Sequence, residues 1–522
     1  MITKWKLLNF KSITNETELN FAPLTILAGA NSSGKSTLLQ SMLLIAQTLA
    51  SEINSRSVVL NGSLTQLGQF DDVCSFDRES DQVLIGWECV PIDVVNFARR
   101  STFKYPLKQV SCTVAFDTQL AAPTAELSQR QPSLFSSTLS ATVIAEDKTD
   151  ITTGFNVTRG IFQPLASDTV AETVAIESLS FQVELDDHSL REIHQQYSSA
   201  TPVGCQLHHF LPDELIIKYH KAKPTVVEAI TYPVIVPIQT PKSLLDASNF
   251  LRSFFSQQVK YLGPLRDEPR SLYPIVPHKD PTDVGLRGEQ TAAVLNYYHK
   301  LPVLFIPPSL FENATELNKT KKNHSVTQTL ESAVIDWLKY LGVAESVATY
   351  DRGKHGHELK VTTFGTRTLQ DLIHVGVGVS QVLPILVMCL LAKPDSTLII
   401  EQPELHLNPL VQTRLGDFFL SQALSHKQCI IETHSEYLIN RLRLRLASTA
   451  DDTLNSLIKT YFVEKKGLQS SFREVFVNEF GAIVNWPTGF FDQSQFEAEA
   501  IIKAAVQKRK AKRVAGREKA NA

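Results

Sequence analysis

The sequence has no long apolar run, no pair of closely spaced cysteines and no large excess of charge of either sign. Its longest apolar stretch, residues 382–392, is about half of the roughly 20 residues that a membrane-spanning helix needs, and the N-terminus lacks the apolar core of a signal peptide. The six cysteines lie far apart without a CxxC pair, which argues against a zinc site or a dithiol redox centre. A net charge of −3 gives no basic field over the whole molecule. We therefore expect a soluble, cytoplasmic protein with no membrane partner and with reduced, mostly buried thiols.

The composition is that of a folded globular protein rather than of a disordered, collagen-like or coiled-coil chain. Apolar residues make up 43% and charged residues 20% of the 522 positions, so the chain can bury a large core. At about 150 residues per domain, this length suggests three or four domains. Between residues 83 and 241, short runs of alternating apolar and polar residues are separated by turn-forming residues. No sustained heptad repeat is found in this stretch. That stretch is expected to be rich in β-strand.

The spacing of apolar residues predicts strands through much of the chain and alternating strands and helices toward its C-terminus. The expected strands lie at 7–10, 19–21, 24–28, 111–116, 181–185, 359–362, 397–400 and 429–432. The expected helices run over 35–46, 244–259 and 326–341. The alternation near the C-terminus is typical of βαβ units in a parallel sheet.

A glycine-rich loop follows the apolar strand at 24–28. Residues 29–36 fit GxxxxGK[ST], with Lys35 and Ser36 as the final pair. In such a loop the backbone N–H groups surround phosphate oxygens, the lysine reaches the β- and γ-phosphates, and the serine hydroxyl binds Mg²⁺. The residues expected to hold the nucleotide are Gly29, Asn31, Ser32, Ser33, Gly34, Lys35, Ser36 and Thr37. The sequence therefore predicts a site for ATP and Mg²⁺.

Three further segments, all after residue 370, carry residue types that complete such a site. The apolar strand at 397–400 ends in Glu401, and a strand-end carboxylate can join the shell of Mg²⁺ beside a phosphate loop. Upstream, residues 375–381 place glycines and a serine at the start of a helix, which is another anion-binding arrangement. Downstream, His434 follows the strand that ends at residue 431. Each segment alone has an ordinary structural explanation, but their order along the chain is informative.

This order resembles the ABC-type ATPase head, in the branch shared by SMC, RecF and OLD-like proteins. The resemblance implies that residues 29–37 form the Walker A loop, that Glu401 and Gln402 take the place of the Walker B acidic pair, and that His434 is the switch histidine. It also places Gly378, Ser380 and Gln381 in the signature, Asn408 in the D-loop, and Lys11 and Ser12 on the N-terminal strand of the head. The implied fold class is α/β, with an ATPase head split by a large β-rich and helical insert and with no long coiled coil.

The same resemblance implies a division of the chain into five parts. These are the first part of the head at 1–80, a β-rich insert at 81–240, a helical insert at 241–355, the second part of the head at 356–465, and a C-terminal segment at 466–522. From residue 503 onward, this last segment carries eight basic residues and one acidic residue. Such a basic tail offers charge for DNA phosphates or for an acidic face of a partner, and a solvated chain end is the alternative.

Four longer motifs, at residues 261–267, 285–289, 401–407 and 486–492, look like bacterial AAA-type ATPases with a short uncharacterised C-terminal domain. This set includes the PtuA-like ATPases of Septu and retron anti-phage systems, which act beside an HNH nuclease. The likeness implies a regulatory or scaffold subunit of a defence complex, a homo-oligomer whose ATPase heads pair when ATP is bound. It also implies an HNH-type nuclease as partner, with nucleic acid or a retron nucleoprotein as a further contact. For residues 486–491, a hydrophobic anchor on the head is the alternative.

The Walker B position departs from the ABC pattern. Where the family has an aspartate and a glutamate, this chain has Glu401 followed by Gln402. A neutral amide cannot accept a proton from the attacking water, so the expected general base is missing. We therefore expect slow hydrolysis, with ATP chiefly holding a conformation. Glu404, two residues further on, is the candidate substitute base.

Two smaller features also differ from the pattern or leave a choice open. In the signature, Gly378 stands where serine is usual, and Ser380 is shifted toward the phosphate. The glutamine expected to contact the metal after the first helix is either Gln66 or Gln69.

Other functions compete with this one. The main alternative is a RecF- or SMC-like ATPase of DNA repair or DNA binding, although an SMC tether needs long coiled-coil arms, which the β-rich insert excludes. An OLD-type nuclease needs a TOPRIM domain after His434, and the 88 residues that follow contain no strand ending in Glu before a DxD strand. A membrane transporter subunit usually has a shorter head without such an insert.

Overall fold

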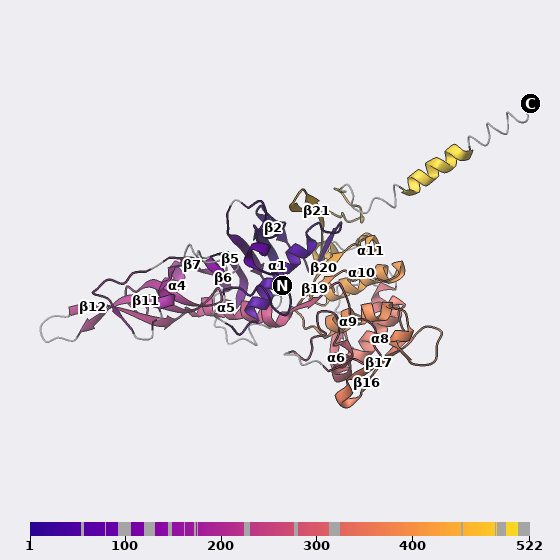
Figure 1. The fold of residues 1–522 in the computed structure, drawn as a ribbon, viewed down its shortest axis with the longest axis horizontal. Helices are drawn as coiled ribbons and strands as arrows, with labels where there is room; N and C mark the ends of the chain where they lie inside the picture. Colours follow the sequence, from indigo (N-terminus) through magenta and orange to yellow (C-terminus); the bar gives the residue numbers. More distant parts are fainter. Residues whose placement is uncertain are drawn as a thin grey trace, which may run out of the picture.

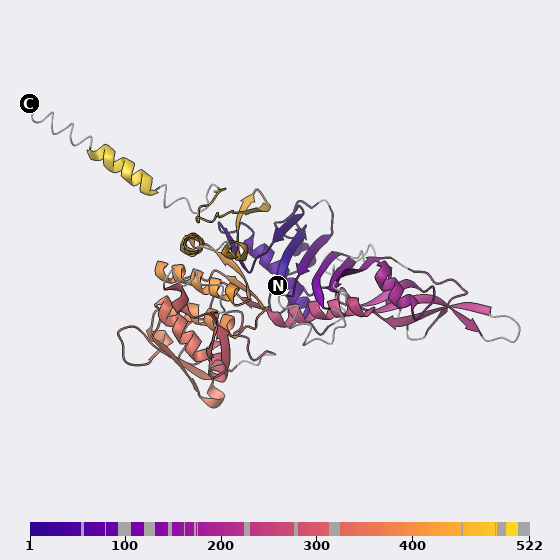
Figure 2. The ribbon, with the colours of Figure 1, turned by 180° about the vertical axis from the view of Figure 1, so that it is seen from behind.

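The structure is a computed structural model of the whole chain. It describes residues 1–53, 57–78, 80–91, 106–118, 131–144, 149–160, 162–171, 174, 176–223, 230–275, 280–312, 324–449, 453–485, 487 and 497–509. Figures 1 and 2 show these parts from opposite sides, with a β-rich arm at one end and a helical lobe at the other.

A six-stranded sheet at the centre joins the two ends of the chain. Its order is β13 (Val259–Leu262), β19 (Thr397–Glu401), β20 (Gln428–Thr433), β3 (Leu24–Gly29), β21 (Ile458–Lys466) and β22 (Gln469–Glu474). All neighbouring strands are parallel except β21 and β22, which form an antiparallel pair. Every residue of β3, β19 and β20 is buried, as the continuous apolar runs predict for parallel strands covered on both faces.

The central sheet separates two hydrophobic cores. Because side chains alternate across a strand, Leu27 of β3 joins one core while Ile26 and Ala28 join the other. The first core contains α1 (Lys35–Leu49) and the second contains α9 (Gly378–Leu391) and α10 (Pro409–Leu424). α11 (Glu436–Ser448) and α12 (Thr453–Leu457) pack on the second core as well.

A seven-stranded antiparallel sheet covers the first core. Its order is β2 (Thr17–Asn20), β1 (Ile2–Leu8), β4 (Val83–Cys89), β5 (Leu107–Thr118), β6 (Pro132–Ile144), β7 (Asp150–Arg159) and β9 (Phe181–Leu185). Trp5 of β1 stacks on Trp87 of β4, and its Nε1–H donates to Ser41 Oγ of α1 at 2.9 Å. The pairing of β1 with β4 crosses residue 80, so the boundary expected there falls inside one continuous sheet.

The arm at the left of Figure 1 continues from this sheet. It consists of β10 (Thr201–His208), β11 (Leu211–Lys223), β12 (Ile230–Gln239) and β8 (Thr169–Val170), with α4 (Asp187–His194) and α5 (Lys242–Ser253) at its base. A π-helical segment, Phe254–Gln258, leads from α5 into β13 and so returns the chain to the central sheet.

The helical lobe lies on the other side of the central sheet. Its elements are α6 (Thr291–Tyr298), β14 (Pro302–Phe305), β15 (Val326–Thr329), α8 (Leu330–Leu341), β16 (Ser346–Asp351), β17 (His357–Thr362) and β18 (Gln370–Asp371), together with α9. A short 3₁₀ helix, Pro308–Phe311, lies between β14 and β15. In the described residues the longest helix is α10, with 16 residues, so no coiled-coil arm is present there.

Most of the expected elements are confirmed, and two need correction. The helix expected over 326–341 begins only at Leu330, because residues 326–329 pair with β14 as a strand. The helix expected over 244–259 begins at Lys242 as α5 and continues as the π-helical segment Phe254–Gln258, so only Val259 is a strand residue, in β13. At residues 326–329 and at Val259, pairing with another strand decides a structure that the apolar pattern alone predicts as helix.

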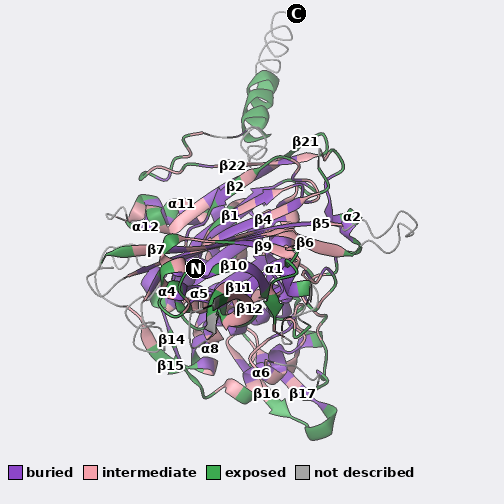
Figure 3. Ribbon diagram, turned by 90° about the vertical axis from the view of Figure 1, so that its left-hand side faces the viewer, coloured by how far each residue is buried: buried purple, intermediate pink, exposed green. Residues whose placement is uncertain are grey.

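A helix over residues 497–509 is exposed along its whole length, as the green segment in Figure 3 shows. The anchor expected at 486–491 and the tail beyond residue 509 lie outside the described residues, apart from Pro487.

The structure also bears on the state of the cysteines and on membrane-spanning helices. All six cysteines are free and buried, as expected. Among the described residues, no helix is both long and apolar enough to cross a membrane.

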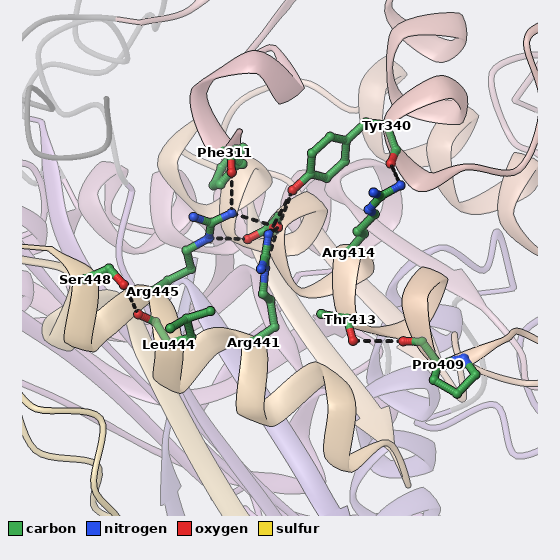
Figure 4. A network of polar contacts seen from close by, with 10 residues as sticks. Phe311, Tyr340, Pro409, Thr413, Arg414, Arg441, Leu444, Arg445 and Ser448 are labelled. Carbon is green, nitrogen blue, oxygen red and sulfur yellow. Dashed lines mark hydrogen bonds and ion pairs between the residues drawn. The ribbon is translucent and has the colours of Figure 1, made fainter. Parts of the chain in front are cut away.

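A buried charge network joins the helical lobe to the central sheet's helices (Figure 4). Asp417 of α10 is fully buried and accepts hydrogen bonds from Arg445 Nε at 2.6 Å and Arg441 Nε at 2.8 Å, both on α11. It also accepts the hydroxyl hydrogen of Tyr340, near the end of α8, at 2.6 Å. Arg445 donates in turn to the Phe311 carbonyl of the lobe at 2.6 Å. One carboxylate thus holds three helices together.

Replacement of Asp417 by alanine should therefore destabilise the lobe strongly. The buried Arg445 and the partly exposed Arg441 would lose their counter-charge, and breaking a buried ion pair costs about 3–5 kcal/mol. Tyr340→Phe removes two hydrogen bonds, the one that the hydroxyl donates to Asp417 and the one that it accepts from Arg441 at 3.2 Å, and should cost only about 1–2 kcal/mol. Urea unfolding followed by tryptophan fluorescence measures both, since Trp337 lies 5.5 Å from the Tyr340 ring. Equal losses in the two variants would contradict this role of Asp417.

Candidate nucleotide-binding site

The phosphate loop connects β3 to α1, as its sequence pattern predicts. Gly29 and Gly34 have φ angles of 153° and 107°, values that other residues rarely adopt. A Cβ atom at Gly29 would lie 2.2 Å from the Val463 carbonyl oxygen, and one at Gly34 would lie 2.0 Å from Ser470 Oγ. The glycines therefore serve two purposes, since they allow both the turn and the close approach of β21 and β22.

Lys35, the first residue of α1, lies in the curve of this loop. Its side chain is 3% exposed, and its Nζ donates to the carbonyl oxygens of Gly29 at 3.1 Å and Ala30 at 2.8 Å. The nearest carboxylate is that of Glu432, with Oε1 4.0 Å from Nζ. Burial lowers the pKa of Lys35, and the nearby Glu432 charge opposes that shift. The loop thus holds a buried ammonium group next to the N-terminus of a 15-residue helix.

The loop opens into a cleft of about 820 Å³. The residues that line it are Lys11, Ser12, Asn31, Ser32, Ser33, Gly34, Lys35, Ser36, Thr37, Gln40, Gln402, Glu404, Leu405, His406, Leu407, Gln412, Glu432, His434 and Lys465. They come from both ends of the chain. The cleft therefore brings together most of the residues that the sequence predicts for the site.

The residues of this cleft fit a nucleoside triphosphate. Ser33 Oγ is a buried polar atom with no hydrogen-bond partner among the described residues, as expected for a loop built around a ligand. The first turn of α1 contains no acidic residue to compete with an anion. Its N–H groups, the Lys35 ammonium and the Ser36 hydroxyl supply the donors and the metal ligand that such loops use.

Glu401, the expected Walker B acid, lies beneath the cleft. It is 6% exposed, and its Oε1 accepts a hydrogen bond from the Tyr261 hydroxyl at 2.8 Å. Its backbone oxygen accepts a hydrogen bond from Arg266 at 3.1 Å. Burial raises the pKa of Glu401, while the Tyr261 hydrogen bond opposes the shift. The motif at 261–267 thus holds the Walker B strand end in place, a role that its sequence did not reveal.

The two polar residues after Glu401 differ in their surroundings. Gln402 adopts a left-handed backbone conformation with a φ of 43°, and its N–H donates to the Glu432 carbonyl at 2.8 Å. Its neutral amide lines the cleft. Both oxygens of Glu404 already accept hydrogen bonds, one from Thr433 Oγ1 at 2.8 Å and one from the backbone N–H of His434. Glu404 therefore fixes the segment that carries the switch histidine.

His434 lines the cleft next to the phosphate loop, where its imidazole forms a hydrogen bond with the backbone of Gly29. Burial lowers the pKa of its imidazole, and the Lys35 charge adds to that shift, so the neutral form is favoured. The next residue, Ser435, caps α11 and donates from its hydroxyl to Gln412 Oε1 at 2.7 Å. Gln412 of α10 in turn donates to the Leu407 carbonyl at 2.8 Å. The segment that carries His434 is thus linked, through Gln412, to Leu407 at the start of the expected D-loop.

The N-terminal strand end contributes Lys11 and Ser12 to the cleft, as the resemblance implies. Lys11 donates to Gln40 Oε1 of α1 at 2.6 Å, and burial lowers the pKa of its ammonium group. The Ser12 hydroxyl lies 3.2 Å from Thr37 Oγ1 and accepts a hydrogen bond from Ser470 Oγ at 2.8 Å. These contacts tie the antiparallel sheet, the phosphate loop and β22 together.

Of the expected signature residues, only Gly378 lines a neighbouring groove, which it shares with Asn408 of the expected D-loop. Gly378 and Asn408 line a cavity of about 310 Å³ that adjoins the nucleotide cleft at His406 and Leu407. Ser380 is 8% exposed, and its hydroxyl donates to the Val377 carbonyl at 2.7 Å. Gln381 is equally buried. Within one chain, these residues do not join the cleft around Lys35.

Neither candidate for the metal-contacting glutamine lines the cleft. Gln69 is exposed at the start of α2 (Phe70–Val73), where its backbone N–H donates to Asp72 at 2.8 Å. Gln66 forms an isolated β-bridge with Asn61. The glutamines that do line the cleft are Gln40, Gln402 and Gln412.

The sequence-based prediction missed one carboxylate in the cleft. Glu432 is 2% exposed and ends β20, and its Oε2 accepts a hydrogen bond from Ser36 Oγ at 3.0 Å. Burial raises its pKa, and the adjacent Glu401 adds to that effect. The signal was available, because Glu432 follows an apolar strand just as Glu401 does. Lys465 and Gln412, which also line the cleft, have no such signal.

The described residues contain no cluster of three or more His, Cys, Asp or Glu side chains that could hold a metal ion alone. A nucleotide site does not need one, because Mg²⁺ there is bound by one or two carboxylates, waters and the phosphates themselves. Ser36, Glu432 and Glu401 provide such a partial set.

Comparisons with protein families match three regions of the chain. Residues 1–204 match a family described as "AAA ATPase domain", and residues 243–440 match one described as "AAA domain, putative AbiEii toxin, Type IV TA system". Residues 455–501 match "Protein of unknown function (DUF3696)". No curated protein matched the chain.

The solved structures that resemble the chain include several SMC heads. The SMC head domain from Thermotoga maritima has a TM-score of 0.36 and 10% identity over 91% of this chain and 99% of its own. An SMC head bound to the C-terminal winged-helix domain of ScpA has a TM-score of 0.41 and 9% identity, over 91% of this chain and 98% of its own. The third is an SMC head with an extended coiled coil, bound to the C-terminal domain of ScpA and derived from Pyrococcus furiosus. It has a TM-score of 0.36 and 9% identity, over 91% of this chain and 96% of its own. Values this low do not transfer a function.

The phosphate loop, the buried lysine and the strand-end carboxylates define a P-loop nucleotide-binding site. Residues 1–204 and 243–440 are similar to AAA ATPase domains, and residues 455–501 are similar to a domain of unknown function. ATPases of the AAA type bind nucleotide, typically with Mg²⁺.

Lys35→Ala should abolish ATP binding, since it removes the buried ammonium group from the loop. Lys465→Ala is a matched control, because Lys465 also lines the cleft but is exposed on its rim. Titration with a fluorescent ATP analogue should show at least a roughly hundredfold weaker affinity for Lys35→Ala, the equivalent of about 2.7 kcal/mol, and a change of no more than about threefold for Lys465→Ala. Equal effects in the two variants would contradict the assignment of the phosphate site.

Proposed function

We propose that this ATPase works as a slow, ATP-dependent conformational switch whose heads associate in pairs while ATP is bound. The observation that carries the proposal is the neutral Gln402 amide in the cleft beside the phosphate loop. The machinery for holding ATP is complete in the chain, whereas the group that would activate water at that position cannot accept a proton.

The remaining carboxylates of the site are all engaged. Glu401 bonds to Tyr261, Glu404 bonds to the switch segment, and Glu432 bonds to Ser36. Glu404 in particular, the candidate substitute base, uses both oxygens to position Thr433 and His434. Since both oxygens of Glu404 already accept protein hydrogen bonds, this candidate base is poorly placed to activate water, which supports slow hydrolysis.

Each group of the site has a role that follows from its place. Lys35 and the N–H groups of α1 would hold the phosphate oxygens, and the hydrogen bond between the His434 imidazole and the Gly29 backbone keeps the histidine beside them. When bound, Mg²⁺ would neutralise charge on those oxygens. Glu404 accepts the backbone N–H of His434, and Gln412 bonds both to Ser435, at the start of α11, and to Leu407. A shift of His434 would therefore move the expected D-loop and α11 as well.

The separation of the two cavities supports pairing of heads. The groove with Gly378 and Asn408 adjoins the cleft but does not face Lys35 of the same chain. In ABC-type heads the signature contacts the nucleotide of a second head, which this placement allows. Bound ATP would then stabilise the pair by mass action.

For the biological setting, we propose the regulatory subunit of an anti-phage defence complex with an HNH-type nuclease as partner. The motifs at 261–267 and 401–407 support it through their likeness to PtuA-like ATPases, and both motifs contribute to the site described above. The gene next to this one provides the test. An HNH nuclease or a reverse transcriptase there would support the setting, and a recombination gene would contradict it.

ATP should make the purified protein larger in solution. With a nonhydrolysable ATP analogue and Mg²⁺, light scattering after gel filtration should show a species of twice the nucleotide-free mass. Lys35→Ala should keep the nucleotide-free mass under the same conditions, because it cannot hold the ligand that completes the interface. An unchanged mass for the wild-type protein with saturating analogue would contradict pairing of the heads.

Steady-state phosphate release should be slow, and Gln402→Glu should accelerate it. That substitution restores a carboxylate at the position of the general base, a contribution that is typically worth about 10²–10⁴ in rate. An increase of roughly tenfold or more would agree with the proposal. Glu401→Ala serves as the control that removes residual activity. An ordinary ATPase rate in the wild type, lost in Glu401→Ala, would contradict slow hydrolysis.

A further inference from the structure

The end of β20 places a second glutamate in the nucleotide cleft. The side chain of Glu432 is only 3% exposed, although it forms part of the cleft wall. Its Oε2 accepts a hydrogen bond from Ser36 Oγ at 3.0 Å, and Ser36 is the residue whose hydroxyl binds the metal in loops of this kind. Glu432 therefore touches the metal-binding residue of the loop directly.

Strand order places this glutamate closer to the phosphate loop than Glu401. β20 lies between β19 and β3, and the register pairs Glu432 with Glu401 on one side and with Leu27 on the other. The two glutamates are thus neighbours at the same edge of the sheet, but β20 pairs directly with the strand that enters the loop. Glu401 is one strand further away and does not line the cleft; it bonds to Tyr261 at 2.8 Å and also interacts with Glu432 and Ser36.

The distance between Ser36 Oγ and Glu432 Oε2 also suits a shared metal ion. Mg²⁺ demands octahedral oxygen ligands at about 2.0–2.1 Å, so two adjacent ligands lie about 2.9 Å apart. The observed 3.0 Å matches that separation, although a hydrogen bond now joins the two oxygens. A metal ion would replace the shared hydrogen with little movement of either side chain.

We propose that Glu432 is a direct ligand of the divalent cation that accompanies the nucleotide, adjacent to Ser36 Oγ. Glu401 then supports the site from beneath, held by Tyr261. This deepens the proposed function and depends on its first part, the binding of nucleotide with Mg²⁺. It does not depend on slow hydrolysis or on pairing of the heads.

Mn²⁺ binding tests this assignment without measuring turnover. Electron paramagnetic resonance counts free Mn²⁺ during titration of the protein with a saturating nonhydrolysable ATP analogue. Glu432→Gln should weaken the Mn²⁺ affinity at least about tenfold, as loss of a metal-site group typically does. Glu474→Gln is the matched control, because Glu474 lies on β22 of the same central sheet but outside the cleft, where it pairs with Lys459 at 3.3 Å. It should change the affinity no more than about threefold.

Two further measurements separate loss of the metal ligand from other failures. Binding of the analogue in EDTA should be the same for the wild type and Glu432→Gln, which shows that the variant is folded and that its phosphate loop is intact. Glu432→Asp keeps the charge on a shorter side chain and should give an intermediate Mn²⁺ affinity.

Several outcomes would overturn the inference. Unchanged Mn²⁺ affinity in Glu432→Gln would do so, and so would a loss confined to Glu401→Gln, which would assign the metal to the Walker B residue. Failure of the wild-type protein to bind the analogue, with or without Mn²⁺, would overturn the proposed function and this inference with it.

Discussion

The pairing of β3 with strands from the other end of the chain is the constraint on which the site depends. β3 lies between β20 and β21, which follow it by about 400 residues, and each of the three is fixed by parallel backbone hydrogen bonds. The phosphate loop can curl as it does only because Val463 and Ser470 of the C-terminal strands pack against its glycines. The same pairing brings Glu432 beside Ser36. Without this strand pairing, Lys35 and the glutamates from the other end of the chain would not lie together in one site.

Three glutamates meet near one lysine, and their surroundings give each a different task. Glu401 is bonded to a tyrosine beneath the cleft, Glu404 to the switch segment, and Glu432 to the serine of the loop. Three carboxylates this close repel one another, and a nucleotide-bound cation would relieve that repulsion. The arrangement is therefore suited to a state with ligand bound, which agrees with the proposal that ATP holds a conformation.

Much of the core of this structure could be predicted from the sequence, because strong local patterns determine it. The motif at 29–36 fixed the loop, and the apolar runs fixed β3, β19 and β20. What could not be predicted depends on pairing between distant residues. Residues 326–329 became a strand because β14 lies beside them, and β1 joined β4 across an expected boundary. Glu432 was missed because its importance comes from its distance to Ser36, which the spacing along the chain does not show.

Hydrogen–deuterium exchange with and without ATP tests most directly that one nucleotide site is built from both ends of the chain. The account predicts that ATP with Mg²⁺ slows exchange together in three segments, residues 29–37, 402–407 and 432–435, because ligand contacts and the bonds between those segments tighten at once. Protection confined to residues 29–37 would contradict it, since the loop would then bind phosphate without the C-terminal strands taking part.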